Sequence, residues 1–157
     1  MLTRLLGGLW RRLPGWLRRR AARLGQKRFT VTVGAFIFDA DNQVLLLEHV
    51  FRPDDGWGVP GGFIGKSEHP HEALQRELLE EVGIELGDIE LVFTRTLPKT
   101  RQIEIYFRAA AIGKPEPCSF EIKRAAWFAI DGLPDDLSRD QRRLIQRALS
   151  VGENSSQ

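Results

Sequence analysis

The feature that most constrains this chain is a cluster of three glutamates, Glu77, Glu80 and Glu81, within residues 61–84. This segment reads GGFIGKSEHPHEALQRELLEEVGI, and its second half has the apolar spacing of a helix. Residues three and four apart share one helical face, so the three carboxylates repel one another. The sequence therefore predicts either a cation bound among them or a solvated acidic face in which Arg76 pairs with Glu80.

The ends of this helix follow from its capping residues. Ser67 or Glu68 is expected to start the helix, because Pro70 is tolerated in a first helical turn. Gly83 is expected to end it, because glycine readily adopts the left-handed conformation of a helix C-cap. The predicted buried side of the helix consists of Ala73, Leu74, Leu78 and Val82.

The residue types around the glutamates indicate which cation they would bind. Carboxylate oxygens suit Mg²⁺ or Mn²⁺, whereas zinc sites are built from Cys and His. His69 and His71 are two residues apart, so they do not share a helical face. We therefore expect Mg²⁺, with Mn²⁺ as a substitute, and no zinc.

The spacing of the charged and glycine residues resembles the signature of the Nudix hydrolases. From Gly62 the pattern runs Gly, five residues, Glu, seven residues, Arg-Glu-Leu, one residue, Glu-Glu, one residue, Gly-Ile. The strands before this pattern and the run AAWFAIDGLP after it are similar to that family as well. The resemblance thus covers roughly residues 29–150, with a flexible tail expected at 151–157.

The resemblance implies a Nudix fold, an α/β/α sandwich with a mixed β-sheet. It also implies a role for each residue of the signature. Glu68 matches a glutamate that supports the arginine or the metal, and Arg76 matches the arginine that orients the glutamates. Gly61 belongs to a turn whose backbone approaches the metal and the phosphates. The matches to the family's metal-binding glutamates are Glu77, Glu80 and Glu81.

Hydrolysis requires a carboxylate that accepts a proton from the attacking water. Glu121 matches a loop glutamate that some members use in this way, and Glu81 is an equal candidate. Glu104 is a further candidate, whose alternative role is a solvent-facing charge on an alternating strand. The resemblance makes Glu81, Glu121 and Arg76 the expected catalytic set.

Four residues are expected to contact the substrate. Trp57 precedes the signature and is expected either to stack on a nucleobase or to anchor its loop in the core. Arg52 resembles an arginine found before the signature in sugar-diphosphate members. Lys99 and Arg101 lie in a connector where other members contact substrate. A plain surface role is the alternative for all three cations.

The resemblance implies Mg²⁺-dependent hydrolysis of a nucleoside diphosphate linked to another moiety, by water attack at phosphorus. The run HVFRP…WGVPGGFI is more similar to ADP-ribose and nucleotide-sugar hydrolases than to triphosphate hydrolases. Pyrophosphohydrolysis of nucleoside triphosphates or RNA 5′ ends is the alternative activity. A non-catalytic nucleotide-sensing domain is the alternative of another class. We expect a small nucleotide-type partner and no nucleic acid.

The rest of the domain reads as alternating strands and helices. Residues 51–62 are expected to form a loop because Pro, Gly and Asp cluster there. A terminal amphipathic helix is predicted at 138–150, followed by a frayed end. Strands are predicted at 28–38, 43–50, 89–98, 101–112 and 122–130.

The first 28 residues differ from the domain in charge. They carry nine Arg or Lys and no acid, whereas the remainder holds 14 basic and 21 acidic residues. Leucines at helical spacing predict a basic amphipathic arm, broken at Pro14–Gly15. The arm is too short and too charged to span a bilayer. Its candidate roles are packing on the domain or on a second subunit, binding to an anionic membrane surface, and a transit peptide.

The expected location and assembly follow from two observations. Cys118 is the single cysteine, so no internal disulfide forms, which fits a cytoplasmic protein. The arm adds attachment to a membrane as an option. Sugar-diphosphate members of the family are often dimers, so the resemblance implies a homodimer that uses the arm.

Overall fold

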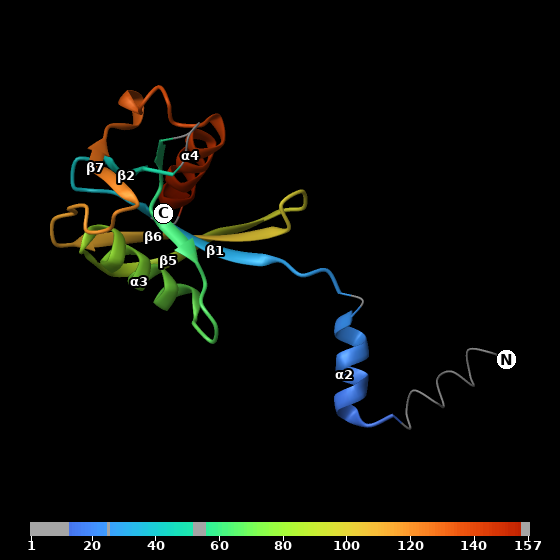
Figure 1. Cartoon of the computed structure of the whole chain (residues 1–157). Coiled ribbons are helices and arrows are strands. Elements are labelled where there is room, and N and C mark those ends of the chain that lie inside the picture. Colours follow the sequence, from blue (N-terminus) through green and yellow to red (C-terminus); the bar gives the residue numbers. More distant parts are fainter. Residues whose placement is uncertain (1–12, 25, 52–55, 155–157) are drawn as a thin grey trace.

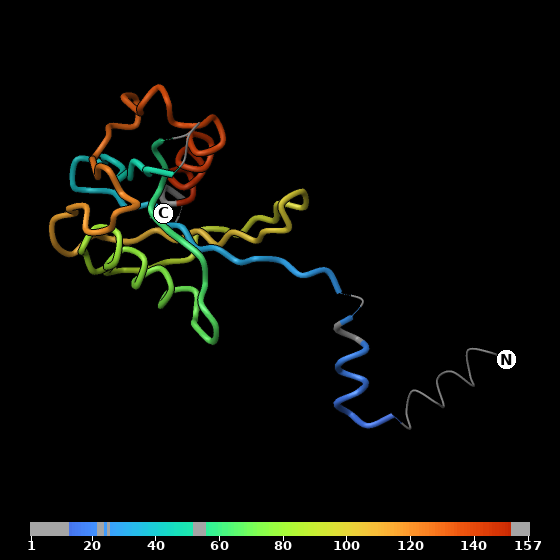
Figure 2. Tube along the Cα trace, in the orientation of Figure 1, coloured from blue at the N-terminus to red at the C-terminus, as the bar shows by residue number. Residues whose placement is uncertain are grey.

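The computed structural model describes residues 13–24, 26–51 and 56–154 (Figures 1 and 2). Its helices and strands, in chain order, are α2 (Gly15–Leu24), β1 (Thr30–Ile37), β2 (Val44–His49), β3 (Trp57–Gly58), β4 (Gly61–Phe63), α3 (Pro70–Val82), β5 (Glu85–Leu97), β6 (Gln102–Ile112), β7 (Ile122–Phe128), the 3₁₀ turn η1 (Ile130–Gly132) and α4 (Arg139–Asn154).

The strands form two sheets. The first has the order β4-β1-β6-β5, and its central pair β1–β6 is parallel while the outer pairs are antiparallel. The second has the order β3-β2-β7 and is antiparallel throughout. The predicted mixed sheet is therefore confirmed.

Strands β1 and β2 supply side chains to two separate cores. On β1, Ala35 and Ile37 pack with the inner side of α3, whereas Phe36 packs with α4. Strand β2 divides in the same way, because successive side chains of a strand point to opposite faces. The two helices therefore cover opposite faces of the sheets, and the α/β/α sandwich is confirmed (Figure 1).

Helix α3 begins later than the capping residues suggest. Ser67 has a φ of 64°, which is incompatible with a helix start, and His69 is the N-cap before Pro70. The backbone N–H of His69 donates to the Glu72 carboxylate at 2.9 Å, which satisfies one of the free donors of the first turn. The predicted C-cap is confirmed: Gly83 has a φ of 69°. The predicted buried side is confirmed as well.

Three other boundaries differ from the prediction. The predicted loop at 51–62 includes β3 and the first two residues of β4, because residues 57–58 pair with β2 and residues 61–62 pair with β1 where local sequence signals only a loop. Strand β5 begins at Glu85, because residues 85–87 already pair with β6. Pairing resumes at Glu90 after a register shift at Asp88, whose φ is 49°. Helix α4 continues to Asn154, so the predicted end at Ser150 is too early.

The described part of the N-terminal arm contains helix α2. The helix begins directly after Pro14, as the predicted break requires. Trp16 and Leu24 are 60% and 81% exposed, so these two apolar residues of the helix are not buried on the domain. Figure 1 shows α2 apart from both sheets, joined to β1 by an extended segment. Among the described residues, no helix is both long and apolar enough to cross a membrane.

Two adjacent leucines of α3 allow a matched test of how this helix is anchored. Leu78 is fully buried and Leu79 is 53% exposed. Leu78→Ala should reduce the free energy of unfolding by about 2–5 kcal/mol, because it leaves a cavity under the helix. Leu79→Ala should change it by less than about 0.5 kcal/mol. Urea denaturation measures both, and equal losses would contradict this packing.

Candidate active site

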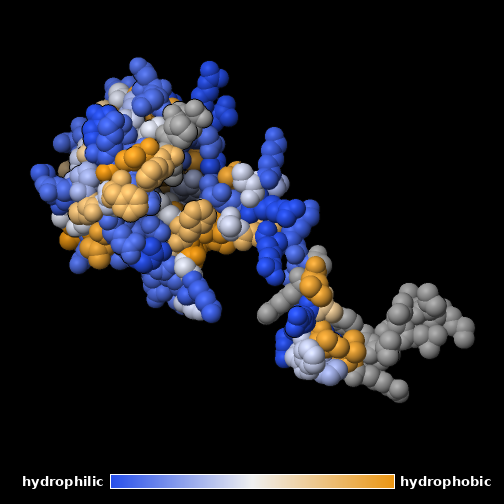
Figure 3. Space-filling view, viewed as in Figure 1, coloured by the Kyte–Doolittle hydropathy of each residue, from blue (hydrophilic) through white to orange (hydrophobic). Residues whose placement is uncertain are grey.

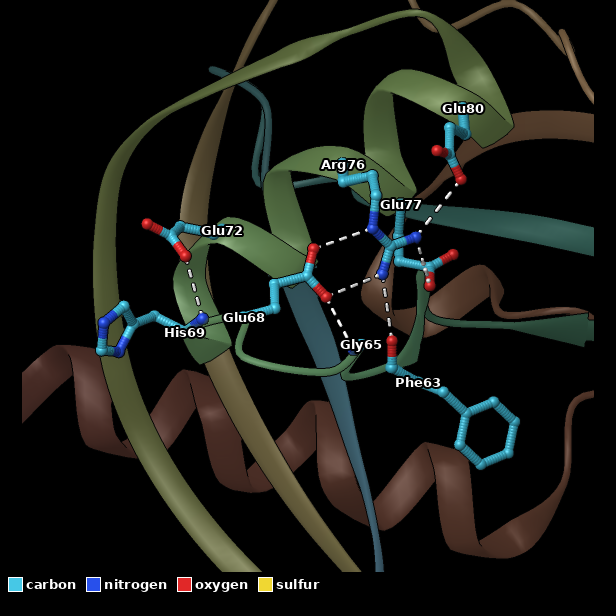
Figure 4. Close-up of polar contacts among 8 residues, drawn as sticks. All are labelled: Phe63, Gly65, Glu68, His69, Glu72, Arg76, Glu77 and Glu80. Carbon is cyan, nitrogen blue, oxygen red and sulfur yellow. Dashed lines mark hydrogen bonds and ion pairs between the residues drawn. The ribbon is translucent and has the colours of Figure 1, made fainter.

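Arg76 lies among Glu68, Glu77 and Glu80, and these four residues form the charged cluster of the site (Figure 4). Its guanidinium donates to both carboxylate oxygens of Glu68, at 2.8 and 3.1 Å. It also donates to Glu77 at 3.0 Å, to Glu80 at 3.3 Å and to the carbonyl oxygen of Phe63 at 3.1 Å. One arginine therefore joins three carboxylates to the backbone of β4.

Hydrogen bonding in this cluster favours the charged forms. Hydrogen bonds to Glu68, followed by those to Glu77, raise the pKa of Arg76 above its ordinary range despite partial burial. The hydrogen bond from Arg76 lowers the pKa of Glu68, and the backbone N–H of Gly65, at 2.7 Å, lowers it further. Hydrogen bonding thus favours the ionised forms of Arg76 and Glu68.

Two glycines of β4 make room for the cluster. A Cβ on Gly62 would lie 2.2 Å from the carboxyl carbon of Glu77, so any side chain there would displace that carboxylate. Gly61 has a φ of 149°, and a Cβ there would lie 2.2 Å from the carbonyl oxygen of Val33. The close approach of β4 to both β1 and α3 requires glycine at both positions.

A pocket of about 430 Å³ adjoins this cluster. Its wall includes both glycines of β4 together with side chains from β1, β6, α3 and α4. Glu81 is 8% exposed and is one of the few buried charged residues in the described part of the chain. The carboxylates that line the pocket are Glu77, Glu81, Glu104 and Glu121.

Glu104 lines the pocket from β6, where hydrogen bonds fix its carboxylate. Its carboxylate accepts hydrogen bonds from Arg95, from Gln102 at 3.2 Å and from the Tyr106 hydroxyl at 3.1 Å. Arg95 in turn forms a double hydrogen bond with Asp140 of α4, at 2.9 and 2.7 Å. The Glu104 side chain is only 14% exposed, so its alternative role as a solvent-facing charge is wrong.

The structure brings together only some of the residues expected in the site. Gly61, Glu77, Glu81 and Glu121 line the pocket. Glu80 does not line it, because its side chain is 60% exposed and points to Arg76. Glu68 lies outside the pocket lining and contacts the site through Arg76.

The expected substrate contacts are not supported in the described part of the chain. Trp57 is 5% exposed and packs edge-on against Phe128 with ring centroids 4.8 Å apart, so it is a core residue and not a wall of the pocket. Lys99 and Arg101 are exposed in the turn between β5 and β6 and do not line the pocket. Figure 1 shows this turn projecting from the body of the domain. Arg52 lies outside the described residues.

Several pocket residues have no signal in the signature itself. Gln102, Glu104 and Tyr106 face one side of β6 because they alternate along it, and this period of two was the available signal. The others come from segments whose proximity only the tertiary fold creates. They include Thr32, Phe51 and Gln141.

The donor set is consistent with a hard divalent cation. Among the described residues, no three His, Cys, Asp or Glu side chains gather closely enough to bind an ion by themselves. Mg²⁺, however, typically uses one or two carboxylates and keeps water and phosphate oxygens as its other ligands. Glu77 and Glu81 supply that number of carboxylates on one pocket wall, beside the space left by Gly62.

The ion pair between Arg95 and Asp140 predicts a pH-dependent contribution to stability. The hydrogen bond to Arg95 lowers the pKa of Asp140 below its ordinary 3.8. A carboxyl whose pKa is lower in the folded state stabilises the fold above its ordinary pKa, and this stabilisation is lost as the pH falls through the folded-state value. Asp140→Asn should therefore be less stable than the parent at pH 7, by a small margin because the group is exposed. Urea denaturation should show this difference shrinking at pH 3, and a constant difference would contradict the assignment.

A family model and individual relatives place the chain among known proteins. The NUDIX domain model matches residues 28–148. The m7GpppN-mRNA hydrolase dcap-2 of Caenorhabditis elegans is 31% identical over 125 residues, covering 73% of this chain and 15% of the relative. The NAD-capped RNA hydrolase NudC of Deinococcus radiodurans is 30% identical over 114 residues, covering 71% of this chain and 41% of the relative. The chain thus spans less than half the length of either relative.

A solved structure has the same architecture. The MutT NUDIX hydrolase from Burkholderia pseudomallei matches with a TM-score of 0.68 and 26% identity, over 77% of this chain and 98% of that one. The residues matched by the NUDIX domain model, 28–148, include the whole of the glutamate cluster, the pocket and both sheets. This chain belongs to the Nudix family.

Proposed function

We propose that the chain is a metal-dependent hydrolase of nucleoside diphosphates linked to another moiety. The observation that supports this is the meeting of four carboxylates, from Glu77, Glu81, Glu104 and Glu121, at one pocket beside a glycine backbone. A diphosphate is a polyanion, so such a pocket would repel it unless cations lie between the two. The pocket is therefore suited to a phosphate substrate that arrives with divalent cations.

In this proposal Glu77 and Glu81 hold the cation, with Mg²⁺ preferred and Mn²⁺ as a substitute. When bound, the cation neutralises charge on the phosphate oxygens and lowers the pKa of a water. Arg76 fixes the position of the Glu77 carboxylate at 3.0 Å. Glu68 and Glu80 act through Arg76, because both contact its guanidinium.

We assign the proton-accepting role to Glu121. Glu121 lines the pocket from an exposed loop, so water has access to it, whereas Glu81 is buried beside the proposed cation. Glu104 is less available as a base because Arg95, Gln102 and Tyr106 already donate to it. Its fixed carboxylate instead shapes the polar wall that faces the substrate.

ADP-ribose and nucleotide sugars are the substrates we place first. A pocket of about 430 Å³ falls within the range of small-molecule sites, and its Thr32, Gln102 and Gln141 offer hydrogen-bonding groups for a sugar. The names of the two curated relatives concern capped RNA, so RNA 5′ ends and nucleoside triphosphates are the alternative substrates. A non-catalytic nucleotide sensor is the alternative of another class.

A substrate panel tests the activity. ADP-ribose, a UDP-sugar, a nucleoside triphosphate and a 5′-triphosphate RNA should each be incubated with Mg²⁺, Mn²⁺ or EDTA. We expect release of a nucleoside monophosphate from the diphosphate-linked compounds and none with EDTA. Preferential cleavage of the triphosphate or the RNA would favour the alternative activity. No turnover of any compound with either metal would favour the sensor.

Substitutions locate the activity in the pocket. Glu81→Gln should lower kcat by about 10²-fold or more, whereas Glu85→Gln, exposed on β5, should leave kcat unchanged. Gly62→Ala should also lower it, because the added methyl group displaces the Glu77 carboxylate. Thermal unfolding should show that all three variants are folded. Full activity in Glu81→Gln would contradict the assignment.

The arm suggests a second role, which we propose separately. Helix α2 leaves Trp16 and Leu24 exposed next to Arg18, Arg19 and Arg20. Figure 3 shows apolar and hydrophilic side chains together on this helix. Such a surface is suited to an anionic membrane or to a second copy of the chain.

Removal of residues 1–28 tests the role of the arm. The full chain should sediment with vesicles that contain anionic lipid, and the truncated chain should not, with neutral vesicles as the control. Sedimentation velocity without lipid shows whether the arm instead makes a dimer. Equal behaviour of both chains in both measurements would remove the proposal.

A further inference from the structure

Two exposed phenylalanines meet at the rim of the pocket. Phe51 follows β2 and Phe120 precedes β7, and their ring centroids are 6.1 Å apart with an interplanar angle of 74°. They are 67% and 78% exposed, and neither belongs to the two hydrophobic cores. This aromatic pair therefore contributes little to the packing of the domain.

The backbone holds the two loops together. Strands β2 and β7 are paired up to His49 and Ile122, and beyond them the N–H of Val50 donates to the carbonyl oxygen of Glu121 at 2.8 Å. On the β7 side, Ser119 closes a tight turn by accepting a hydrogen bond from the N–H of Ile122 at 3.2 Å. The two rings are thus presented from anchored chain positions.

The aromatic pair is continuous with the carboxylate pocket. Phe51 itself lines the pocket, as does Glu121, which follows Phe120 directly in the chain. Phe63, which is 63% exposed, lines the same pocket from β4. Figure 3 shows apolar side chains gathered on the viewed face of the domain. A ligand whose phosphates lie among the carboxylates can therefore reach the rings.

We propose that Phe51 and Phe120 form a stacking site for the nucleobase of the substrate. This inference rests on the proposed function, because it assumes a nucleotide in the pocket. Phenyl rings offer no hydrogen-bonding groups, so they suit neither sugar hydroxyls nor phosphate oxygens. A nucleobase is flat and has a π-face, and exposed aromatic rings bind that face with little dependence on base identity.

The site takes over the role that the sequence suggested for Trp57, which is buried in the core. It also predicts a division of recognition within the substrate. Binding of the phosphates should depend on the carboxylates and their cation, whereas binding of the nucleobase should depend on the two rings. Loss of the rings should therefore weaken the binding of nucleotides and leave the binding of base-free diphosphates unchanged.

Binding of nucleoside monophosphates to the full chain tests this without any need for turnover. The dissociation constants of AMP, GMP, CMP and UMP should be measured by calorimetry with Mg²⁺ present. Phe51→Ala and Phe120→Ala should each raise the dissociation constants of the nucleotides by about 5- to 100-fold. Phe51→Trp should retain binding, because tryptophan keeps an aromatic face. Phe29→Ala is the matched control, since Phe29 is 37% exposed and does not line the pocket.

A kinetic comparison separates this inference from the proposed function. If the protein hydrolyses ADP-ribose, the two alanine variants should raise its KM while the KM for 5-phosphoribosyl diphosphate, which lacks a base, stays unchanged. Unchanged nucleotide affinity in both variants would overturn the stacking site even if hydrolysis is intact. Ring-dependent binding without hydrolysis of any substrate would overturn the proposed function alone.

Two further outcomes also overturn the stacking site. One is that none of the four monophosphates binds to the parent chain. The other is a change of oligomeric state in the alanine variants, measured by sedimentation velocity, with nucleotide affinity unchanged. That second result would assign the rings to contact with a second copy of the chain.

Discussion

The arrangement of the site depends on one guanidinium placed among like charges. Three carboxylates that would repel one another on or beside a helix are held by Arg76, which also contacts the backbone of β4. Without that arginine, the cluster would be costly to fold. With it, one carboxylate of the cluster, Glu77, is held at a fixed position on the pocket wall.

The pocket is built from two walls that have different physical roles. On the α3 side, Glu77 and Glu81 are placed by a helix whose inner side is anchored in a hydrophobic core. On the β6 side, Glu104 is held by neutral donors and by an arginine that is itself fixed to α4. Both walls are therefore held by regular elements, whereas Glu121 and the aromatic rim come from loops, which is the usual distribution for residues that contact varied ligands.

Glycine has a structural role at the junction of these walls. The β4 backbone passes very close to β1 and α3. A side chain at position 61 would overlap with Val33, and one at position 62 would overlap with Glu77. The glycines of the signature are thus explained by the space that the carboxylate occupies. Their presence also leaves backbone exposed at the pocket, next to the proposed position of the phosphates.

The sequence by itself determined the family, the course of α3 and the residues of its glutamate cluster, because these features depend on spacing within one helix and its preceding turn. The two-sided core was also predictable in kind, because strands and helices are interspersed along the chain, an order that favours a mixed sheet with helices on both faces. Only the tertiary structure decided that Glu80 lies outside the pocket lining, and that Trp57 lies in the core.

The tertiary structure also decided which distant residues complete the site. Phe51, Glu104 and Glu121 are far apart in the chain, and they meet at one pocket only through the pairing of β1 with β6 and of β2 with β7. Strand pairing and helix docking depend on long-range contacts, whereas capping, periodicity and residue spacing are local. That difference is the physical reason why the chemistry of the site could be predicted from the sequence and the shape of its pocket could not.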